Sequence, residues 1–133
     1  MMRRFAVPFF VVILALLPLW PSSASEPFPF GDELVLDVSP MHGSKRIPML
    51  EIEENGTATI DLWCASLRGQ VTIGEGTLTI VPGDAPAVQC EPQRQAGDAD
   101  LLAALAQVTG WRRHGEVVEL LGTTTLRFRK MTN

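Results

Sequence analysis

The stretch TIDLWCASLRGQVTI, residues 59–73, decides the fold of this 133-residue chain. Apolar and polar side chains alternate along both of its arms, which is the pattern of strands with one buried face. In the first arm Leu62 and Cys64 share a face, and in the second arm Val71 and Ile73 do so. The stretch therefore predicts two strands, the first of which ends at a cysteine on its inward face.

Turn signals divide the sequence around this stretch into short strands. Asn55-Gly56 predicts a type I′ hairpin turn, because both residue types accept positive φ angles. The glycine-rich GEG at 74–76 lies between two alternating arms, so it predicts a second hairpin and not a phosphate-binding loop. Further segments predict a first strand at 33–38, a loop rich in Pro, Gly and Ser at 39–48, and a short strand at 87–90.

The segment DADLLAALAQVTG, residues 98–110, changes to the period of a helix. Its leucines recur at helical spacing, and its alanines raise helix propensity. Asp98 suits the N-cap position, and Gly110 suits the left-handed position after a helix. We therefore expect one α-helix over about 98–109.

Short alternating segments resume after the helix and run to the C-terminus. In the last of them, TTTLRFRK, Leu126 and Phe128 share one face, while Arg127 and Arg129 share the other. The sum is an α+β fold, mostly an antiparallel β meander that curls into a small barrel or bowl, with one α-helix packed on it.

The N-terminus has the order of a secretory signal peptide. A basic MMRR is followed by an apolar run and then by the small residues of PSSAS. We expect a signal peptide over 1–25, cleaved after Ser25 or after Ala24, then an extended leader at 26–32 and a single domain at 33–131. The alternative is an uncleaved membrane anchor, but the apolar run is short and contains two prolines. The first cysteine lies far downstream, which argues against a lipid anchor.

The net negative charge of the chain argues against nucleic acid and anionic lipid as partners. The full chain has a net charge of −4. Cleavage after Ser25 would remove two arginines and leave a net charge of −6 on 108 residues. An acidic surface repels nucleic acid and anionic lipid. We expect a monomer in the periplasm or outside the cell, with no stable membrane span after cleavage.

Candidate catalytic and metal-binding residues lack partners at the required spacing. His42 and His114 are far apart, and neither has a further ligand at zinc spacing. No serine lies in a Gly-x-Ser-x-Gly elbow. The acidic cluster Glu51, Glu53 and Glu54 resembles a solvated strand edge. We therefore expect no enzymatic activity, no metal and no cofactor.

Two groups of residues have both a functional and a structural interpretation. In an exported chain, Cys64 and Cys90 predict a disulfide, and two buried reduced thiols are the alternative. Trp63, Trp111 and Phe128 can line a cavity for an apolar ligand, or they can be ordinary core residues, since small barrels fill with side chains. The loop HGSKR, residues 42–46, can form a basic patch with Arg112, Arg127 and Arg129, although singly solvated side chains explain them more simply.

The order of elements resembles the META domain family, also called HslJ-like, over roughly residues 33–130. The resemblance rests on the segments ATIDLWC, RGQVTIGEGTLTI, AVQCEP, DLLAALAQVTGWRRHGEVVELLG and TTTLRFRK. The chain departs from the family in having Trp63 and Ala65 around its first cysteine, and Val88-Gln89 before its second. The resemblance implies a small β-rich envelope or secreted domain, without established catalysis, associated with envelope stress, drug tolerance or secretion.

The sequence favours a non-catalytic exported domain that binds a protein or a small apolar ligand, or acts as a scaffold, in the bacterial envelope. One alternative is a secreted inhibitor of a protease or lysozyme, which would insert the mobile leader EPFPFG or the 39–48 loop into an active site. Another alternative is a carrier of an apolar ligand inside the bowl.

Overall fold

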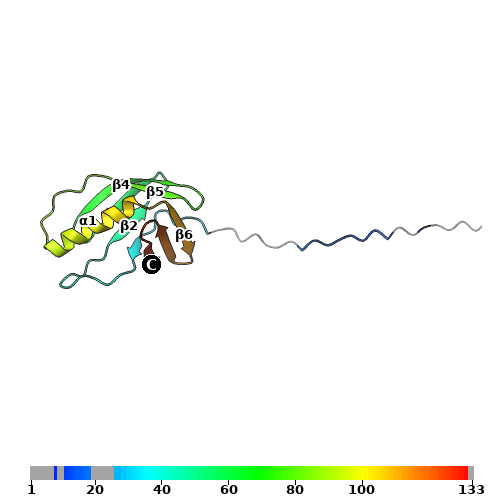
Figure 1. Ribbon diagram of the computed structural model, residues 1–133, viewed down its shortest axis with the longest axis horizontal. Coiled ribbons are helices and arrows are strands. Elements are labelled where there is room, and N and C mark those ends of the chain that lie inside the picture. Colours follow the sequence, from blue (N-terminus) through cyan, green and yellow to red (C-terminus); the bar gives the residue numbers. More distant parts are fainter. Residues whose placement is uncertain (1–7, 9–10, 19–25, 132–133) are drawn as a thin grey trace, which may run out of the picture.

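The computed structural model describes residues 8, 11–18 and 26–131, and Figure 1 shows the path of the chain. In chain order the elements are β1 (Leu34–Leu36), β2 (Met49–Ile52), β3 (Thr57–Asp61), β4 (Ser66–Ile73), β5 (Leu78–Pro82), α1 (Pro92–Ala106), β6 (Gly110–His114), β7 (Val117–Leu121) and β8 (Leu126–Lys130). The predicted α+β class with one helix is confirmed for the described residues.

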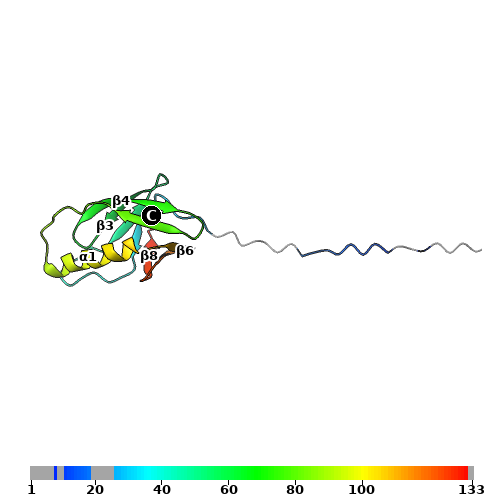
Figure 2. The same cartoon turned by 45° about the horizontal axis from the view of Figure 1, so that its top comes forward.

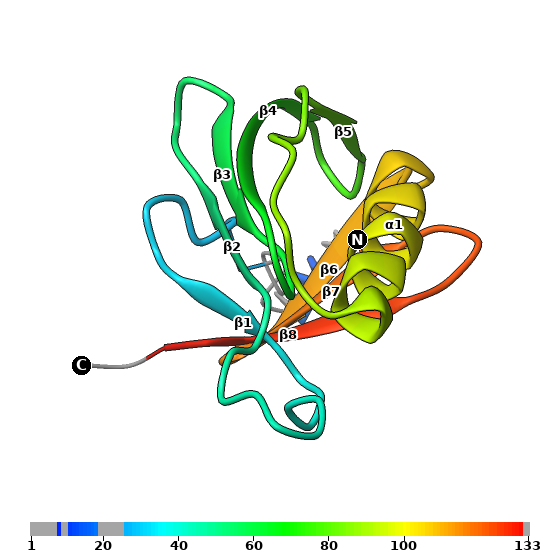
Figure 3. The same cartoon turned by 90° about the vertical axis from the view of Figure 1, so that its left-hand side faces the viewer.

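The eight strands form one antiparallel sheet that curls into a nearly closed barrel. The strand order is β5-β4-β3-β2-β1-β8-β7-β6, so that β5 and β6 are the two edges. These edges meet at one end, where Thr77 and Gly110 form an isolated bridge. The Leu78 N–H donates to the Thr109 carbonyl at 3.2 Å there. Figure 3 shows α1 packed beside this seam, against β5, where it covers the opening that the strands leave.

Side chains fill the interior of the barrel. The inward-facing side chains of β2, β3, β7 and β8 are buried, because these strands alternate with period two around one apolar face. Phe128 is 1 % exposed and packs with them. The largest fully buried side chains are those of Phe128, Leu34, Leu50, Ile52, Ile60, Leu62, Leu78, Leu105, Leu120, Val108, Val118 and Pro48.

The β2–β3 turn differs from the predicted type I′ geometry. Gly56 has a φ of 89°, whereas no residue other than glycine has a positive φ in the described chain. The Gly56 N–H donates to the Glu53 carbonyl at 2.9 Å, so the loop ends in one left-handed glycine. A Cβ on Gly56 would also lie 2.7 Å from the Val71 carbonyl oxygen. The glycine is required because its backbone approaches β4 closely.

The helix begins earlier and ends earlier than its sequence signals indicate. It spans Pro92–Ala106, with Pro92 in the first turn, where a missing N–H costs nothing. The expected N-cap, Asp98, lies inside the helix and is buried, so that prediction is wrong. Gly110 is the first residue of β6, not the residue that ends the helix. Residues 87–90 form no strand and belong to the loop before α1.

The leader is part of the folded domain. Phe28 is 6 % exposed, and its ring packs on those of Phe30 and Trp111 with centroid separations of 5.1 and 5.2 Å. Arg113 donates from Nη1 to the Pro27 carbonyl at 2.9 Å. The leader is therefore docked on β6, through the Phe28–Trp111 contact and the bond from the half-buried Arg113, and is not the free segment expected.

Arg112, Arg127 and Arg129 form ion pairs with nearby carboxylates instead of a free basic patch. Arg112 of β6 pairs with Glu119 of β7 at 2.8 Å. Arg127 and Arg129 of β8 both pair with Asp37 at 3.1 and 3.2 Å. The hydrogen bond from Arg112 holds the pKa of the Glu119 carboxyl below its ordinary value. Opposite charges therefore alternate over this part of the outer sheet face.

Within the described ranges, no helix combines the length and the apolar character needed to cross a membrane.

Gly97 provides a test of how closely α1 approaches the rest of the fold. A Cβ there would lie 2.5 Å from Met41 Cε and 2.8 Å from Trp63 Cδ1. We expect Gly97→Ala to lower the free energy of unfolding by about 1 kcal/mol, because overpacking of about 1–3 kcal/mol outweighs a gain in helix propensity of about 1 kcal/mol. Chemical denaturation measures this change.

The matched background is Met41→Ala, which removes one of the two obstructing side chains. In that background the cost of Gly97→Ala is expected to shrink, since the two sites are coupled. A stabilisation by Gly97→Ala in the otherwise unchanged protein would contradict the close approach.

Candidate functional site

The turn between β3 and β4 is the most tightly tied part of the described chain. The Leu62 N–H donates to the Ala65 carbonyl at 2.8 Å, which closes a two-residue hairpin loop of Trp63 and Cys64. The other closing groups of the loop are the Leu62 carbonyl and the Ala65 N–H, and each of these bonds to a charged side chain from elsewhere in the chain. Segments that are distant in sequence therefore complete the hydrogen bonding of this short turn.

Asp98 binds the donor side of this turn. It lies in α1 and is 8 % exposed. Its Oδ1 accepts the Cys64 N–H at 3.0 Å, and its Oδ2 accepts the Ala65 N–H at 2.8 Å. A buried carboxylate needs such bonds to offset its lost hydration, and bonds to a charged acceptor are stronger than neutral ones. Asp98 therefore acts as a cap for a hairpin, not for a helix.

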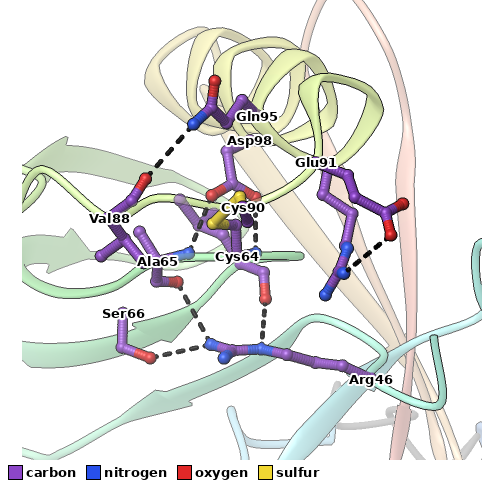
Figure 4. Close-up of a disulfide and its surroundings, with 11 residues drawn as sticks. Arg46, Cys64, Ala65, Ser66, Val88, Cys90, Glu91, Gln95 and Asp98 are labelled. Carbon is purple, nitrogen blue, oxygen red and sulfur yellow. Dashed lines mark hydrogen bonds and ion pairs between the residues drawn. A yellow bond between two sulfur atoms is a disulfide. The ribbon is translucent and has the colours of Figure 1, made fainter.

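Arg46 binds the acceptor side of the same turn. Its Nε donates to the Leu62 carbonyl at 2.8 Å, and its Nη2 donates to the Ala65 carbonyl at 3.3 Å and to Ser66 Oγ at 2.9 Å. Figure 4 shows this guanidinium on the opposite side of the turn from Asp98. The 39–48 loop, expected to be a candidate for insertion into a partner, is thus anchored through Arg46.

A disulfide ties the turn a third time. Cys64 and Cys90 are bonded, with a Cα–Cα distance of 6.3 Å and a sequence separation of 26. The predicted pairing is confirmed, and it accounts for both cysteines of the chain. Neither residue lies in a strand, since Cys64 is in the hairpin turn and Cys90 is in the loop before α1. The bond therefore holds that loop against the turn, next to Asp98 (Figure 4).

A hollow of about 210 Å³ lies between the turn, the loop before α1 and the helix. Its lining is mostly apolar and includes one sulfur of the disulfide. The lining residues are Leu62, Cys64, Ala65, Ala85, Pro86, Ala87, Val88, Gln95, Asp98 and Leu102. A hollow below the usual range of about 300–1,000 Å³ is small for a drug-sized ligand.

The three aromatic residues predicted to line a cavity lie in different surroundings. Phe128 is in the barrel core. Trp111 is half-buried, and its Nε1 donates to the Gly74 carbonyl at 3.1 Å. Trp63 is 9 % exposed and packs near Gly97 of α1. None of the three lines the 210 Å³ hollow.

Sequence reasoning missed the roles of Arg46 and Asp98. The sequence predicts a solvated loop charge at Arg46 and a helix N-cap at Asp98, and neither prediction involves the turn at Trp63 and Cys64. The available signal was the apolar neighbourhood of Asp98 within the helical segment, since a carboxylate that falls on the buried face of a helix needs a partner. The partner itself is 33 residues away in sequence and is visible only in the fold.

No group of three or more His, Cys, Asp or Glu side chains is arranged to hold a metal ion in the part of the chain that the structure describes. The side chains of Asp98 and Gln95 at this site already have protein partners, whereas the buried Nε of Arg94 in α1 has none among the described residues. Asp98 uses both oxygens on the turn, and Gln95 donates from Nε2 to the Val88 carbonyl at 3.3 Å. The geometry therefore fits a structural clamp with an exposed loop above it.

Asp98 is expected to be a major contributor to stability. We predict that Asp98→Ala lowers the free energy of unfolding by about 3 kcal/mol, because it leaves the buried Ala65 N–H without a partner and removes a second charge-assisted bond. Asp98→Asn keeps one acceptor and should lose about half as much. Denaturant unfolding of the oxidised protein measures both changes.

The control is Asp100→Ala, which removes an exposed carboxylate from the same helix. Its effect should stay within about 0.5 kcal/mol, as for most surface substitutions. Equal losses for the two alanine variants would show that the clamp contributes nothing.

The disulfide should contribute a comparable amount. For a closed loop of 26 residues, the chain-entropy relation gives a loss of about 3–4 kcal/mol in the Cys64→Ser, Cys90→Ser double variant. Thermal unfolding with and without a reducing agent measures it. The reductant should lower the midpoint of the unchanged protein and leave that of the double variant where it is. A midpoint that the reductant does not move would count against the bond.

Comparison with known proteins agrees with this architecture. A family model described as the META domain matches residues 33–132, which is more than half of the chain and includes every strand, the helix and both bonded cysteines. No curated protein and no solved structure matches the chain. The chain belongs to the META domain family.

Proposed function

We propose that this chain is an exported domain of the bacterial cell envelope that acts by binding or as a scaffold, without catalysing a reaction. The Cys64–Cys90 disulfide carries the proposal. Such bonds form and persist in oxidising compartments, such as the periplasm, and are rare in the cytosol. The association with envelope stress implied by the family resemblance is compatible with that location.

The N-terminal residues support export. The described apolar side chains at Val11–Leu14 and Leu16–Leu17 are 76–91 % exposed, so they do not pack on the domain. Glu26 is in contact with the folded domain, since its carboxylate accepts the Gly115 N–H at 3.0 Å and pairs with Arg113 at 3.3 Å. Cleavage after Ser25 would leave Glu26 as the first residue of the mature protein, and this residue already bonds to the folded domain.

The use of polar groups supports binding over catalysis. The buried carboxylate of Asp98 is occupied by two backbone N–H groups. Arg112, Arg127 and Arg129 on the outer sheet face are paired with the carboxylates of Glu119 and Asp37. A general acid or base needs a free position within reach of a substrate, and these groups have structural partners there instead.

The alternative of an apolar-ligand carrier is not favoured. Phe128 and the strand side chains around it fill the barrel, and the larger of the two described hollows measures about 210 Å³ and lies outside the barrel core. The inhibitor alternative is predicted from the sequence to use the leader or the 39–48 loop. The segment that favours it is instead the exposed loop before α1, which the disulfide anchors.

Export has a direct test in the full chain. Expression in a bacterium with a general secretion pathway should place the protein in the periplasm, beginning at Glu26 or at Ser25, with both cysteines oxidised. Intact mass and N-terminal peptides identify the cleavage site, and alkylation before and after reduction counts the thiols.

The matched control is the Arg3→Glu, Arg4→Glu variant, which reverses the charge of the n-region and should slow export. Full-length protein in the cytoplasm, with two thiols open to alkylation, would refute the proposal.

A further inference from the structure

The loop between β5 and α1 is the most exposed internal segment of the folded domain. All residues from 83 to 89 are exposed, and they run without a helix, strand, turn or bend. Figure 2 shows this segment arching away from the sheet before it reaches the start of α1. It presents Ala85, Pro86, Ala87 and Val88 to solvent, and Val88 is 42 % exposed.

Both ends of this loop are fixed to the same framework. At the first end the Gly83 N–H donates to the Arg68 carbonyl of β4 at 2.8 Å, and a Cβ on Gly83 would lie 2.5 Å from that oxygen. At the second end Cys90 is bonded to Cys64. Gln95 of α1 also holds the Val88 carbonyl, at 3.3 Å. The extended shape is thus imposed by anchors, because a hollow lies under the loop and gives it little to pack on.

We propose that residues 84–89 form a substrate-like loop that inhibits a serine protease with a small primary specificity pocket. This proposal rests on the exported binding role and names its partner. Proteases bind their substrates as extended strands through main-chain hydrogen bonds, and they read side chains in pockets. A loop held in that shape before binding loses less conformational freedom on association than a free peptide does.

The side chains select the class of protease. Residues 83–89 contain no basic or aromatic residue, so a pocket that needs a cation or a large ring has nothing to bind. Ala87 fits a small pocket of the elastase type. Pro86 before it keeps Ala85 extended, because proline disfavours helical angles at the residue before it. The bond presented to the protease is Ala87–Val88.

The anchors account for inhibition in place of cleavage. The protease serine hydroxyl attacks the Ala87 carbonyl carbon, the Ala87–Val88 C–N bond breaks, and the hydroxyl proton passes through the protease histidine to the Val88 nitrogen. Gln95 and the disulfide keep the new amine beside the acyl-enzyme ester. The amine can therefore attack the ester, return the proton and restore the peptide bond before water enters.

The test is steady-state peptide hydrolysis by elastase and by trypsin in the presence of the purified, oxidised protein. Micromolar protein should reduce elastase activity about tenfold or more and leave trypsin unaffected. Ala87→Arg should weaken the effect on elastase about a hundredfold, because a small apolar pocket rejects a charge, and it should create inhibition of trypsin. The exposed position of Ala87 makes folding tolerant of this change.

A second pair of variants tests the anchors. Gln95→Ala should speed cleavage of the Ala87–Val88 bond by bound elastase, measured by mass spectrometry. Gln93→Ala, an exposed residue in the same helical turn, should not. Absence of elastase inhibition overturns the proposal, as does inhibition that Ala87→Arg leaves unchanged. Cleavage of the loop as fast as that of a free peptide of residues 84–89 overturns it too.

Failure of this experiment differs from failure of the proposed function. Export and disulfide formation are measured on full-length protein in cells, with no protease involved. If the protein is exported and oxidised but does not inhibit elastase, the binding role remains and this loop is excluded as an inhibitory loop. If the protein stays reduced in the cytoplasm, the proposed function fails whatever elastase does.

Discussion

The structure depends on three connections to one hairpin turn. The turn of Trp63 and Cys64 receives a carboxylate on its N–H side, a guanidinium on its C=O side and a covalent bond through its cysteine. Each connection brings a different segment to the same place: α1 through Asp98, the 39–48 loop through Arg46, and the loop before α1 through Cys90. A buried carboxylate left without these donors would be costly, so the helix has a single favourable position.

This constraint compensates for an incomplete barrel. The strands leave β5 and β6 in contact at one end only, through the bridge of Thr77 and Gly110. An open edge presents unpaired backbone groups, and covering the edge is one of the ways in which proteins protect it. Here α1 lies in the covering position, and Gly97 lets it approach Trp63 and Met41 closely. The clamp on the turn and the closure of the barrel are therefore parts of one arrangement.

The same arrangement leaves the outside of the molecule as the place for the proposed binding surface. The interior is filled, the leader is docked through Phe28 and Arg113, and the arginines of β6 and β8 are paired with carboxylates. The loop above the disulfide is one of the exposed apolar parts of the domain, together with Val38 and Val81. A small domain with one modest core has little room for an internal ligand site. A loop with fixed ends provides such a domain with a rigid surface segment, and this segment takes up no volume in the core.

Local patterns in the sequence determined most of the strands and the presence of one helix, and they left only two cysteines to pair. The alternation of apolar and polar residues in 57–61, 70–73 and 126–130 predicts strands of a half-buried sheet, because successive side chains of a strand point to opposite faces. Helical spacing in 101–105 is equally local. The family resemblance rested on the same segments.

Only the tertiary structure decided where the helix starts, what Asp98 and Arg46 do, and that the leader is docked. Gly97-Asp98 has the form of a helix start, yet the helix begins at Pro92, because the glycine accommodates Trp63 and the aspartate accepts bonds from the Cys64 and Ala65 N–H groups. Arg46 and Phe28 likewise have partners that lie 16 and 83 residues away, at Leu62 and Trp111. Such roles depend on which groups from distant parts of the sequence come into contact in the fold. The spacing of residues along the chain does not determine those contacts.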